Sequence, residues 1–259
     1  MLTIGNVYGH GFGKDQLARL EAFGFSLRPG IGSYAGSQVL RFLDFGEGPT
    51  LELIEVESAD EYKSFLPAGM EPYCPGIALA LGEEDLIDEY ARRFARLDPY
   101  RLHFNYNGSA NPDKPGVTYL NFAEPVVRGA FTWLEALDEP IPALERVTAH
   151  ANRATNVLGL VFDLGLGALD DFAELTEAEK SGDALLLGAL TIWPKAALGG
   201  LPAGREKSFP LNAVVVEAEN LDFFATPPRG VSETTFLSRR AVLIETSPLC
   251  WDLVLVAVD

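Results

Sequence analysis

Two glutamates stand in apolar, strand-like runs, where a carboxylate can take part in chemistry. Glu52 alternates with Leu51 and Leu53, so a strand here places its side chain on the opposite face from the two leucines. A carboxylate partly removed from water needs a cation or hydrogen-bond donors. The other interpretation is an exposed glutamate on the solvent face of the strand. Glu135 stands late in a second such run, and its neighbour Trp133 could line the same cleft or fill the core.

The chain has three histidines, each with a functional and a structural interpretation. His10 directly follows the first predicted strand. It could reach a metal only if that strand continued through Gly9, so the pattern favours a loop position. His103 lies in an apolar run, which favours packing in the core or at its rim. His150 precedes a later strand, where it either faces a ligand or orders the preceding loop through a hydrogen bond.

A glycine-rich segment, residues 9–13, joins the first predicted strand to the first predicted helix. Backbone donors at a helix N-terminus attract anions, which makes nucleotide binding a hypothesis to test. The spacing is wrong for a dinucleotide fingerprint, because Lys14 stands where the third glycine is needed, and the Gly-Lys-Ser/Thr ending of a P-loop is missing. The Gly-x-Ser-x-Gly and His-Glu-x-x-His motifs are also missing, which argues against hydrolases and metalloproteases.

The composition is that of an acidic globular protein. Of 259 residues, 47% are hydrophobic, and 37 acidic against 20 basic residues give a formal net charge of -17. Such a surplus of negative charge repels phosphate backbones and anionic lipids, so we expect neither nucleic acid nor a membrane as a partner. The length fits one or two domains.

The two cysteines, Cys74 and Cys250, are far apart and have no paired spacing, which predicts reduced thiols instead of a disulfide framework or a zinc site. No apolar run reaches the length of a membrane span, and the first residues lack the pattern of a signal peptide. We therefore expect a cytoplasmic protein.

The order of predicted elements repeats along the chain. A strand is followed by an amphipathic helix, marked in the first unit by Leu17, Leu20 and Phe23, and then by further strands. Gly24 takes the left-handed position that ends this helix. The predicted strands cover 2–8, 39–43, 50–56, 77–81, 102–106, 117–122, 130–137, 155–162, 184–193, 213–217, 241–245 and 251–256, and the predicted helices cover 14–23, 83–97 and 168–180.

This order predicts an α+β fold in which repeated βαβββ units form curved mixed sheets around a cleft. We expect paired units over residues 1–140 and one or more further βαβββ-like units over residues 141–259. Glycine-rich or turn-rich segments at 30–36, 107–116 and 199–204 are expected to be loops.

Several of these segments resemble glyoxalase-like domains of the vicinal oxygen chelate superfamily, which includes glyoxalases, bleomycin-resistance proteins and extradiol dioxygenases. The similar features are Phe23-Gly24-Phe25 after the first helix, the 30–36 loop, and Leu51 to Glu55 in the closing strand. His150 and Asn152 belong to a stretch that is similar to the His-x-Asn-Gly-Ala stretch opening a later unit of larger members, with arginine in place of its glycine.

The resemblance implies one divalent metal ion, either Fe, Mn, Ni or Zn, held by side chains of the first and last strands of the units. Glu52 matches the closing-strand glutamate, as a metal ligand or base, and Glu135 is the corresponding second catalytic carboxylate. His10 is the candidate for a second metal ligand. The first predicted strand itself contains no histidine, so a protein without any metal is the alternative. The expected ligand-binding residues are Tyr8, Trp133, His150 and Asn152.

Three functions are compatible with these features. The first is a metal-dependent lyase, isomerase or dioxygenase acting on a small oxygen-rich substrate, in which a glutamate moves a proton. The second is a metal-free protein of the bleomycin-resistance kind, which binds an antibiotic or aromatic molecule between aromatic side chains. The third is an interaction scaffold whose clefts are filled. For each we expect a monomer or a homodimer.

Overall fold

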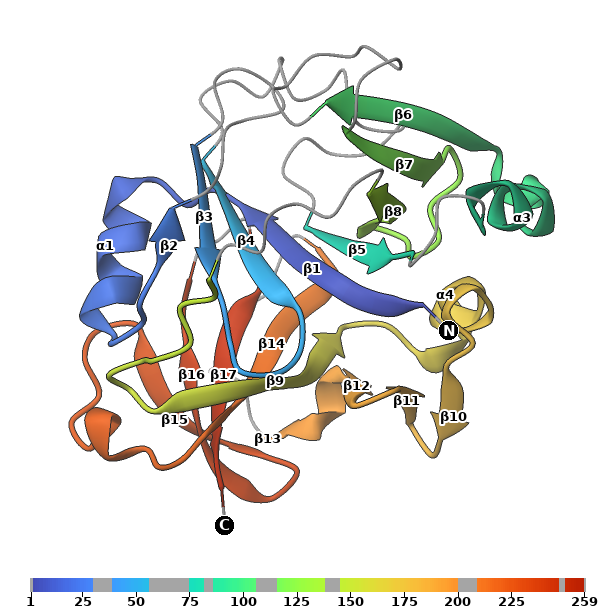
Figure 1. The fold of residues 1–259 in the computed structure, drawn as a ribbon. Coiled ribbons are helices and arrows are strands. Elements are labelled where there is room, and N and C mark those ends of the chain that lie inside the picture. The colour runs from blue at the N-terminus through green and yellow to red at the C-terminus, as the bar shows by residue number, and fades with distance from the viewer. Residues whose placement is uncertain are drawn as a thin grey trace.

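The computed structural model describes residues 2–29, 39–55, 75–81, 86–105, 116–137, 145–199, 209–246 and 250–258 (Figure 1). Cys74, the 30–36 loop and nearly all of the predicted 107–116 and 199–204 loops lie outside the described residues. No helix in the described ranges is long and apolar enough to cross a membrane.

The first sheet has eight strands in the order β2-β3-β4-β1-β5-β8-β7-β6. Two βαβββ units meet where β1 pairs antiparallel with β5, and in each unit the first strand pairs parallel with the last, β1 with β4 and β5 with β8. The strands are β1 Thr3–His10, β2 Arg28–Pro29, β3 Val39–Leu43, β4 Thr50–Glu55, β5 Gly76–Ala80, β6 Pro99–Asn105, β7 Gly116–Phe122 and β8 Phe131–Leu137, with helices α1 Lys14–Ala22, α3 Leu86–Arg93 and the 3-10 turn η1 Ala95–Leu97.

The second sheet repeats this plan with nine strands in the order β10-β11-β12-β9-β14-β17-β16-β15-β13. Here β9 pairs antiparallel with β14, and parallel pairs join β9 to β12 and β14 to β17. The elements are β9 Ala154–Phe162, β10 Glu179–Ser181, β11 Ala184–Leu187, β12 Leu190–Pro194, β13 Leu198–Gly199, β14 Leu211–Ala218, β15 Val231–Phe236, β16 Arg239–Ile244 and β17 Asp252–Ala257, with α4 Asp170–Thr176 and the 3-10 turns η2 Leu166–Leu169, η3 Lys195–Ala197 and η4 Asp222–Phe224. The predicted α+β class with repeated βαβββ units is confirmed.

Two predicted elements of the second sheet differ from the structure. The predicted helix 168–180 is shorter, because α4 ends at Thr176, the following Glu177 takes a left-handed conformation with φ 58°, and residues 179–181 form β10. The predicted strand 184–193 is a hairpin of β11 and β12. Gly188 has φ 60°, a backbone conformation that turns the chain and that glycine adopts without steric cost.

The two sheets share one hydrophobic core. The largest cluster of buried apolar side chains draws members from both sheets and from α1, α3 and α4. Trp251 is fully buried, and its indole N–H donates to the backbone carbonyl of Tyr8 in β1 at 3.2 Å. Gly9 fits against Cys250 and Trp251, since a Cβ at Gly9 would lie 1.9 Å from the Sγ of Cys250 and 3.1 Å from the indole nitrogen of Trp251. The central strand of the first sheet therefore packs directly on the end of the second.

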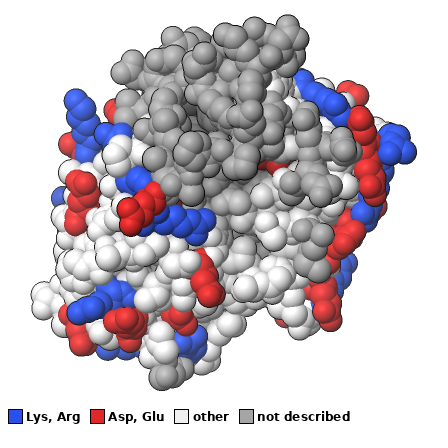
Figure 2. All heavy atoms as spheres, viewed as in Figure 1, with Lys and Arg blue, Asp and Glu red and all other residues white. Residues whose placement is uncertain are grey.

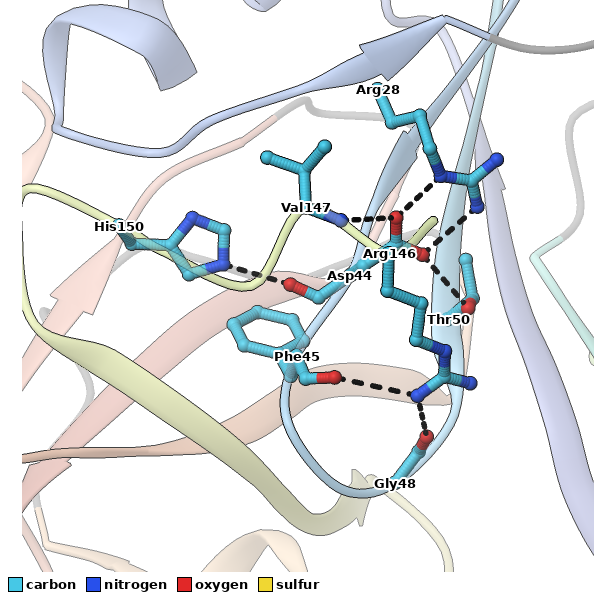
Figure 3. A network of polar contacts seen from close by, with 8 residues as sticks. All are labelled: Arg28, Asp44, Phe45, Gly48, Thr50, Arg146, Val147 and His150. Atoms are coloured by element: carbon cyan, nitrogen blue, oxygen red, sulfur yellow. Dashed lines mark hydrogen bonds and ion pairs between the residues drawn. The ribbon is translucent and has the colours of Figure 1, made fainter. Parts of the chain in front are cut away.

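A buried polar network joins the segment before β9 to the first sheet (Figure 3). Asp44, which is fully buried, accepts hydrogen bonds from Arg28 at 2.6 and 3.0 Å, from the Thr50 hydroxyl at 3.0 Å and from the Val147 N–H at 3.4 Å. Burial alone would raise the pKa of Asp44, but the hydrogen bonds and the charge of Arg28 hold it below its ordinary value. Asp44 is therefore a buried anion with a full set of donors.

The surface over α3 and α4 carries side chains of both signs, visible along the right-hand edge of Figure 2. Arg96 contacts Asp171 at 2.7 Å and Glu174 at 2.6 Å, and Arg93 contacts Glu177 at 3.1 Å. These pairs link the two sheets at their helical edge. Exposed pairs of this kind contribute little to stability, so the linkage relies mainly on the buried core and on the network around Asp44.

Replacing Asp44 tests whether the buried network contributes more to stability than the exposed ion pairs. Asp44→Ala leaves the guanidinium of Arg28 largely buried without its anion, so we expect a loss of about 3 kcal/mol in the free energy of unfolding, measured by urea titration. Lys180→Ala removes an exposed partner of Asp170 and serves as the control, with an expected change below about 1 kcal/mol. Equal losses in the two variants would contradict the role given to Asp44.

Candidate functional site

One face of the first sheet, which we call the inner face, gathers the carboxylates and aromatic rings singled out from the sequence. Strand alternation places Tyr8 on this face and Val7 in the main core, and it places Glu52 opposite Leu51 and Leu53 as predicted. On β8, Trp133 belongs to the inner-face cluster while Leu134 lies in the main core, so Glu135 shares the face of Trp133. The inner-face apolar cluster consists of Tyr8, Leu40, Ile54, Ala78 and Trp133, with Tyr119 packed against it.

His10 is part of β1 and not of a loop. The predicted loop position is wrong, because β1 continues through Gly9, whose register partner is Leu53, to His10, whose register partner is Ile54 of β4. The His10 side chain is fully buried, and its ring meets the ring of Tyr8 edge-on at 5.2 Å. His10 therefore shares the face of Tyr8 and Glu52.

Small residues in β5 let the aromatic rings of β1 and β8 meet across it. Tyr8 is paired with Gly76, and its ring lies over that glycine, since a Cβ there would be 2.1 Å from the Cε1 of Tyr8. Asn6 and Trp133 are the register partners of Ala78 on either side. The rings of Tyr8 and Trp133 lie 4.6 Å apart although a whole strand separates their backbones.

The surroundings of Glu52 and Glu135 favour the protonated, uncharged form of each carboxyl group. Burial raises the pKa of Glu52, and the charge of Glu135 raises it further, to about 8. Burial also raises the pKa of Glu135, to about 7, while a hydrogen bond donated by the Trp133 indole N–H at 2.8 Å opposes the rise. Near neutral pH the pair therefore holds at least one proton that ordinary glutamates have lost.

The neighbouring strand β7 adds two residues to the inner face. Tyr119 is the register partner of Glu135, and its ring lies 6.3 Å from that of Trp133. Asn121, two residues further on the same face, is 2% exposed, and its side-chain nitrogen has no hydrogen-bond partner among the described residues. Asn121 was not predicted from the sequence, although the alternation over 117–122 places it on the same face as Tyr119.

Comparison with solved structures identifies the fold. No protein-family model matches the chain, and no curated protein sequence matches it. Similar structures include a hypothetical protein from Staphylococcus aureus, with TM-score 0.59, 8% identity and full coverage of both chains. The 2,3-dioxygenase LapB from Pseudomonas sp. KL28 has TM-score 0.57 and 9% identity over 99% of this chain and 91% of its own. The Mn(II)-bound glyoxalase from Novosphingobium aromaticivorans has TM-score 0.53 and 11% identity over 99% and 83%.

The chain has the vicinal oxygen chelate fold. At these identities the likeness shows the fold alone.

The donors on the inner face do not fit the metal site that the vicinal oxygen chelate fold implies. Such a site takes side chains from the first and last strand of the units, but β5 offers only glycine, alanine, isoleucine and leucine. Glu52 and Glu135 remain, with Tyr8 and His10 on β1. Among the described residues, no three His, Cys, Asp or Glu side chains are grouped so that they could hold a metal ion. Although β1 brings His10 to this face, His10 does not group with both glutamates, and two carboxylates alone are fewer ligands than divalent ions usually take from protein.

His150 and Asn152, expected to bind a ligand, lie instead where the chain passes between the two sheets of the vicinal oxygen chelate fold. The Ser26 N–H donates to Nδ1 of His150 at 3.1 Å, so Nε2 carries the proton and donates to the Asp44 carbonyl at 2.8 Å (Figure 3). Burial lowers the pKa of His150, consistent with this neutral form. Asn152 donates to the Phe23 carbonyl at 2.9 Å. These contacts match the loop-ordering interpretation, and they do not bring His150 to the glutamates.

His103 lies on the opposite face of its sheet from Tyr119. Its register partner on β7 is Thr118, whose hydroxyl is 3.1 Å from its Nδ1, and Thr118 alternates with Tyr119. On the corresponding face of the second sheet, apolar side chains form a separate cluster containing Val161, Leu198, Ala213, Val215, Phe236, Ala241, Leu243, Val254 and Val256. Ser232, Arg239 and Asp252 lie on the same face as this cluster.

The carboxyl pair makes the stability of the protein depend on pH. Because the folded protein binds these protons more tightly than the unfolded chain, the stabilising contribution is complete below the ordinary pKa of 4.5 and is lost as pH rises through about 7 and 8. We expect Glu52→Gln to be more stable than the parent above pH 8, on the order of a few kcal/mol, and similar to it near pH 4. Urea unfolding across this pH range measures the difference.

Glu55→Gln is the matched control, since Glu55 lies on the same strand with its side chain on the other face. It should follow the parent's pH profile. A Glu52→Gln variant that loses stability equally at every pH would show that Glu52 makes structural hydrogen bonds and is not a desolvated acid.

Proposed function

We propose that the protein binds a small aromatic molecule on the inner face of its first sheet, without a resident metal ion. The observation that carries this proposal is the meeting of Tyr8 and Trp133 over the glycine and alanine positions of β5. Rings held this way, with their planes tilted by 49°, offer apolar ring faces and ring edges, which aromatic ligands contact. Glu52, Glu135 and Asn121 supply the few polar groups that orient such a ligand.

A metal-dependent lyase or dioxygenase has less support. The similar structures include dioxygenases and a Mn(II)-bound glyoxalase, which makes this activity a natural alternative for the fold. The ligand positions of β5 are occupied by residues without donor side chains, however, and no step of such a reaction can be assigned to the inner-face residues without a third protein ligand.

Metal analysis separates these functions. We expect the purified protein to contain no stoichiometric Fe, Mn, Ni or Zn, and we expect its melting temperature to be unchanged by EDTA, because ligand removal lowers stability only where the ligand binds the folded state. Stoichiometric metal that is lost in Glu52→Gln, together with a lower melting temperature, would contradict the proposal and favour the enzyme.

Substitution of the glycine under Tyr8 tests the aromatic site itself. Tyrosol, a neutral phenol, is titrated into the parent protein and binding is followed by calorimetry. In Gly76→Ala the new methyl group overlaps the ring of Tyr8, so we expect affinity to fall by about tenfold or more and stability by about 1–3 kcal/mol.

Gly167→Ala is the control, because a Cβ at Gly167 has no neighbour within 4 Å. It should bind tyrosol as the parent does. If Gly76→Ala folds and binds tyrosol with unchanged affinity, the aromatic pair is core packing and the proposed site is wrong.

A further inference from the structure

We infer that the ligand is an organic cation, an aromatic amine whose ammonium group lies between Glu52 and Glu135 and which also carries an oxygen that accepts a hydrogen bond from Asn121. This inference rests on the proposed function and specifies its ligand class. Such a ligand requires three features of the inner face: two acidic side chains that one cation can contact, aromatic rings beside them, and a hydrogen-bond donor that has no acceptor among the described residues.

The negative charge converges across four strands. Glu52 is on β4 and Glu135 on β8, the strands that flank the central pair β1 and β5. Both side chains are partly exposed while Tyr8 and Trp133 between them are nearly buried. Glu52 is the register partner of Tyr8, whose ring lies 4.6 Å from that of Trp133, and the Trp133 indole N–H donates to Glu135, so the two carboxyl groups stand at either end of one ring pair. Among the described residues, neither carboxylate forms an ion pair with a protein cation.

The aromatic wall favours an ammonium group over a bare metal ion. An alkylammonium interacts with the face of a tyrosine or tryptophan ring as well as with carboxylates, and it keeps part of its stabilisation when it leaves water. A divalent ion needs several oxygen ligands at fixed distances, which two carboxylates do not provide. The rings of Tyr8, Trp133 and Tyr119 form a continuous series, with centroid separations of 4.6 and 6.3 Å.

Asn121 is an independent sign of a ligand. It is almost completely buried, its side-chain nitrogen lacks an acceptor within the described part of the chain, and its place two residues after Tyr119 directs it to the inner face. A buried amide donor without a partner is costly, and such groups in folded proteins usually have a use. An amide N–H donates to oxygen, so the ligand should carry a hydroxyl, ether or carbonyl oxygen near its aromatic part.

Other polar and titratable groups face the carboxyl pair from the surrounding strands. Among the described residues they are Asn6, Tyr8 and His10 on β1, Arg28 on β2, Asp44 after β3, Thr50 on β4, Tyr100 on β6, and Tyr119 on β7. Arg28 stacks on Phe42 at 4.4 Å, and its guanidinium is already paired with Asp44. The pair is therefore short of positive charge, and a cation entering near neutral pH should displace protons from the two carboxyl groups.

Three related probes test the inference by calorimetry at pH 7. Tyramine is a cationic phenol, tyrosol is its neutral alcohol counterpart, and phenethylamine is the cation without the phenolic oxygen. We expect tyramine to bind about tenfold or more tightly than tyrosol, and severalfold more tightly than phenethylamine. Phosphate and Tris differ in ionisation enthalpy, so protons released on binding make the observed binding enthalpy differ between the two buffers. We expect such a difference for tyramine and none for tyrosol.

Variants assign each effect to its residue. Glu52→Gln should reduce the preference for tyramine over tyrosol to about twofold and abolish most of the proton release. Asn121→Ala should make tyramine and phenethylamine bind equally. Glu55→Gln, on the other face of β4, is the control for charge and should behave as the parent does. Circular dichroism melting of each variant confirms that it folds.

The outcomes distinguish the inference from the function on which it rests. If tyrosol binds as tightly as tyramine in the parent, the cation is wrong while the aromatic site stands. If Mn(II) alone saturates the protein stoichiometrically and competes with tyramine, the carboxyl pair is a metal site and the inference is overturned. If none of the three probes binds a folded parent protein, the proposed aromatic site fails, and the inference fails with it.

Discussion

The pairing of β1 with β5 is the constraint on which the rest of the structure depends. Each is the first strand of its unit and lies beside the last strand of that unit, so one antiparallel contact brings four strands into the order β4-β1-β5-β8. Residues far apart in the chain, such as Glu52 and Glu135, which are 83 positions apart, are thereby placed on one face. The contact also requires small side chains on the inner face of β5, because the ring of Tyr8 must pass over that strand to reach the ring of Trp133. Gly76 and Ala78 satisfy that requirement.

The segment that connects the two sheets is held in place by buried hydrogen bonds. Asp44 and His150 hold the segment before β9 against the first sheet, and each is saturated with hydrogen bonds in its buried position. Fully satisfied buried networks specify geometry, whereas half-satisfied ones destabilise. The core around Gly9 and Trp251 then fixes the second sheet against β1. The inner face is consequently built on a strand that is supported from behind along its length.

Local sequence patterns predicted the elements and the faces of their side chains better than the contacts between them. The alternation of Leu51, Glu52 and Leu53 was sufficient to place Glu52, because strand geometry is a property of neighbouring residues. The end of β1 was missed, since His10 belongs to the strand only through its pairing with β4, about forty residues later. His150 illustrates the same limit: its partners Ser26 and Asp44 lie more than one hundred residues away in the chain.

The polar groups on the inner face of the first sheet are the argument that this face has a function. Both sheets follow the same strand plan, and the equivalent face of the second carries an apolar cluster together with a few polar residues, among them Ser232, Arg239 and Asp252. The first sheet places on its inner face two acids whose pKa values are raised by burial and an amide donor without an acceptor among the described residues. Burying such groups opposes folding, so packing alone does not account for them. Perturbed carboxyl groups gathered with aromatic rings are characteristic of sites that bind or transform a ligand, and in this chain they occur on the inner face of the first sheet.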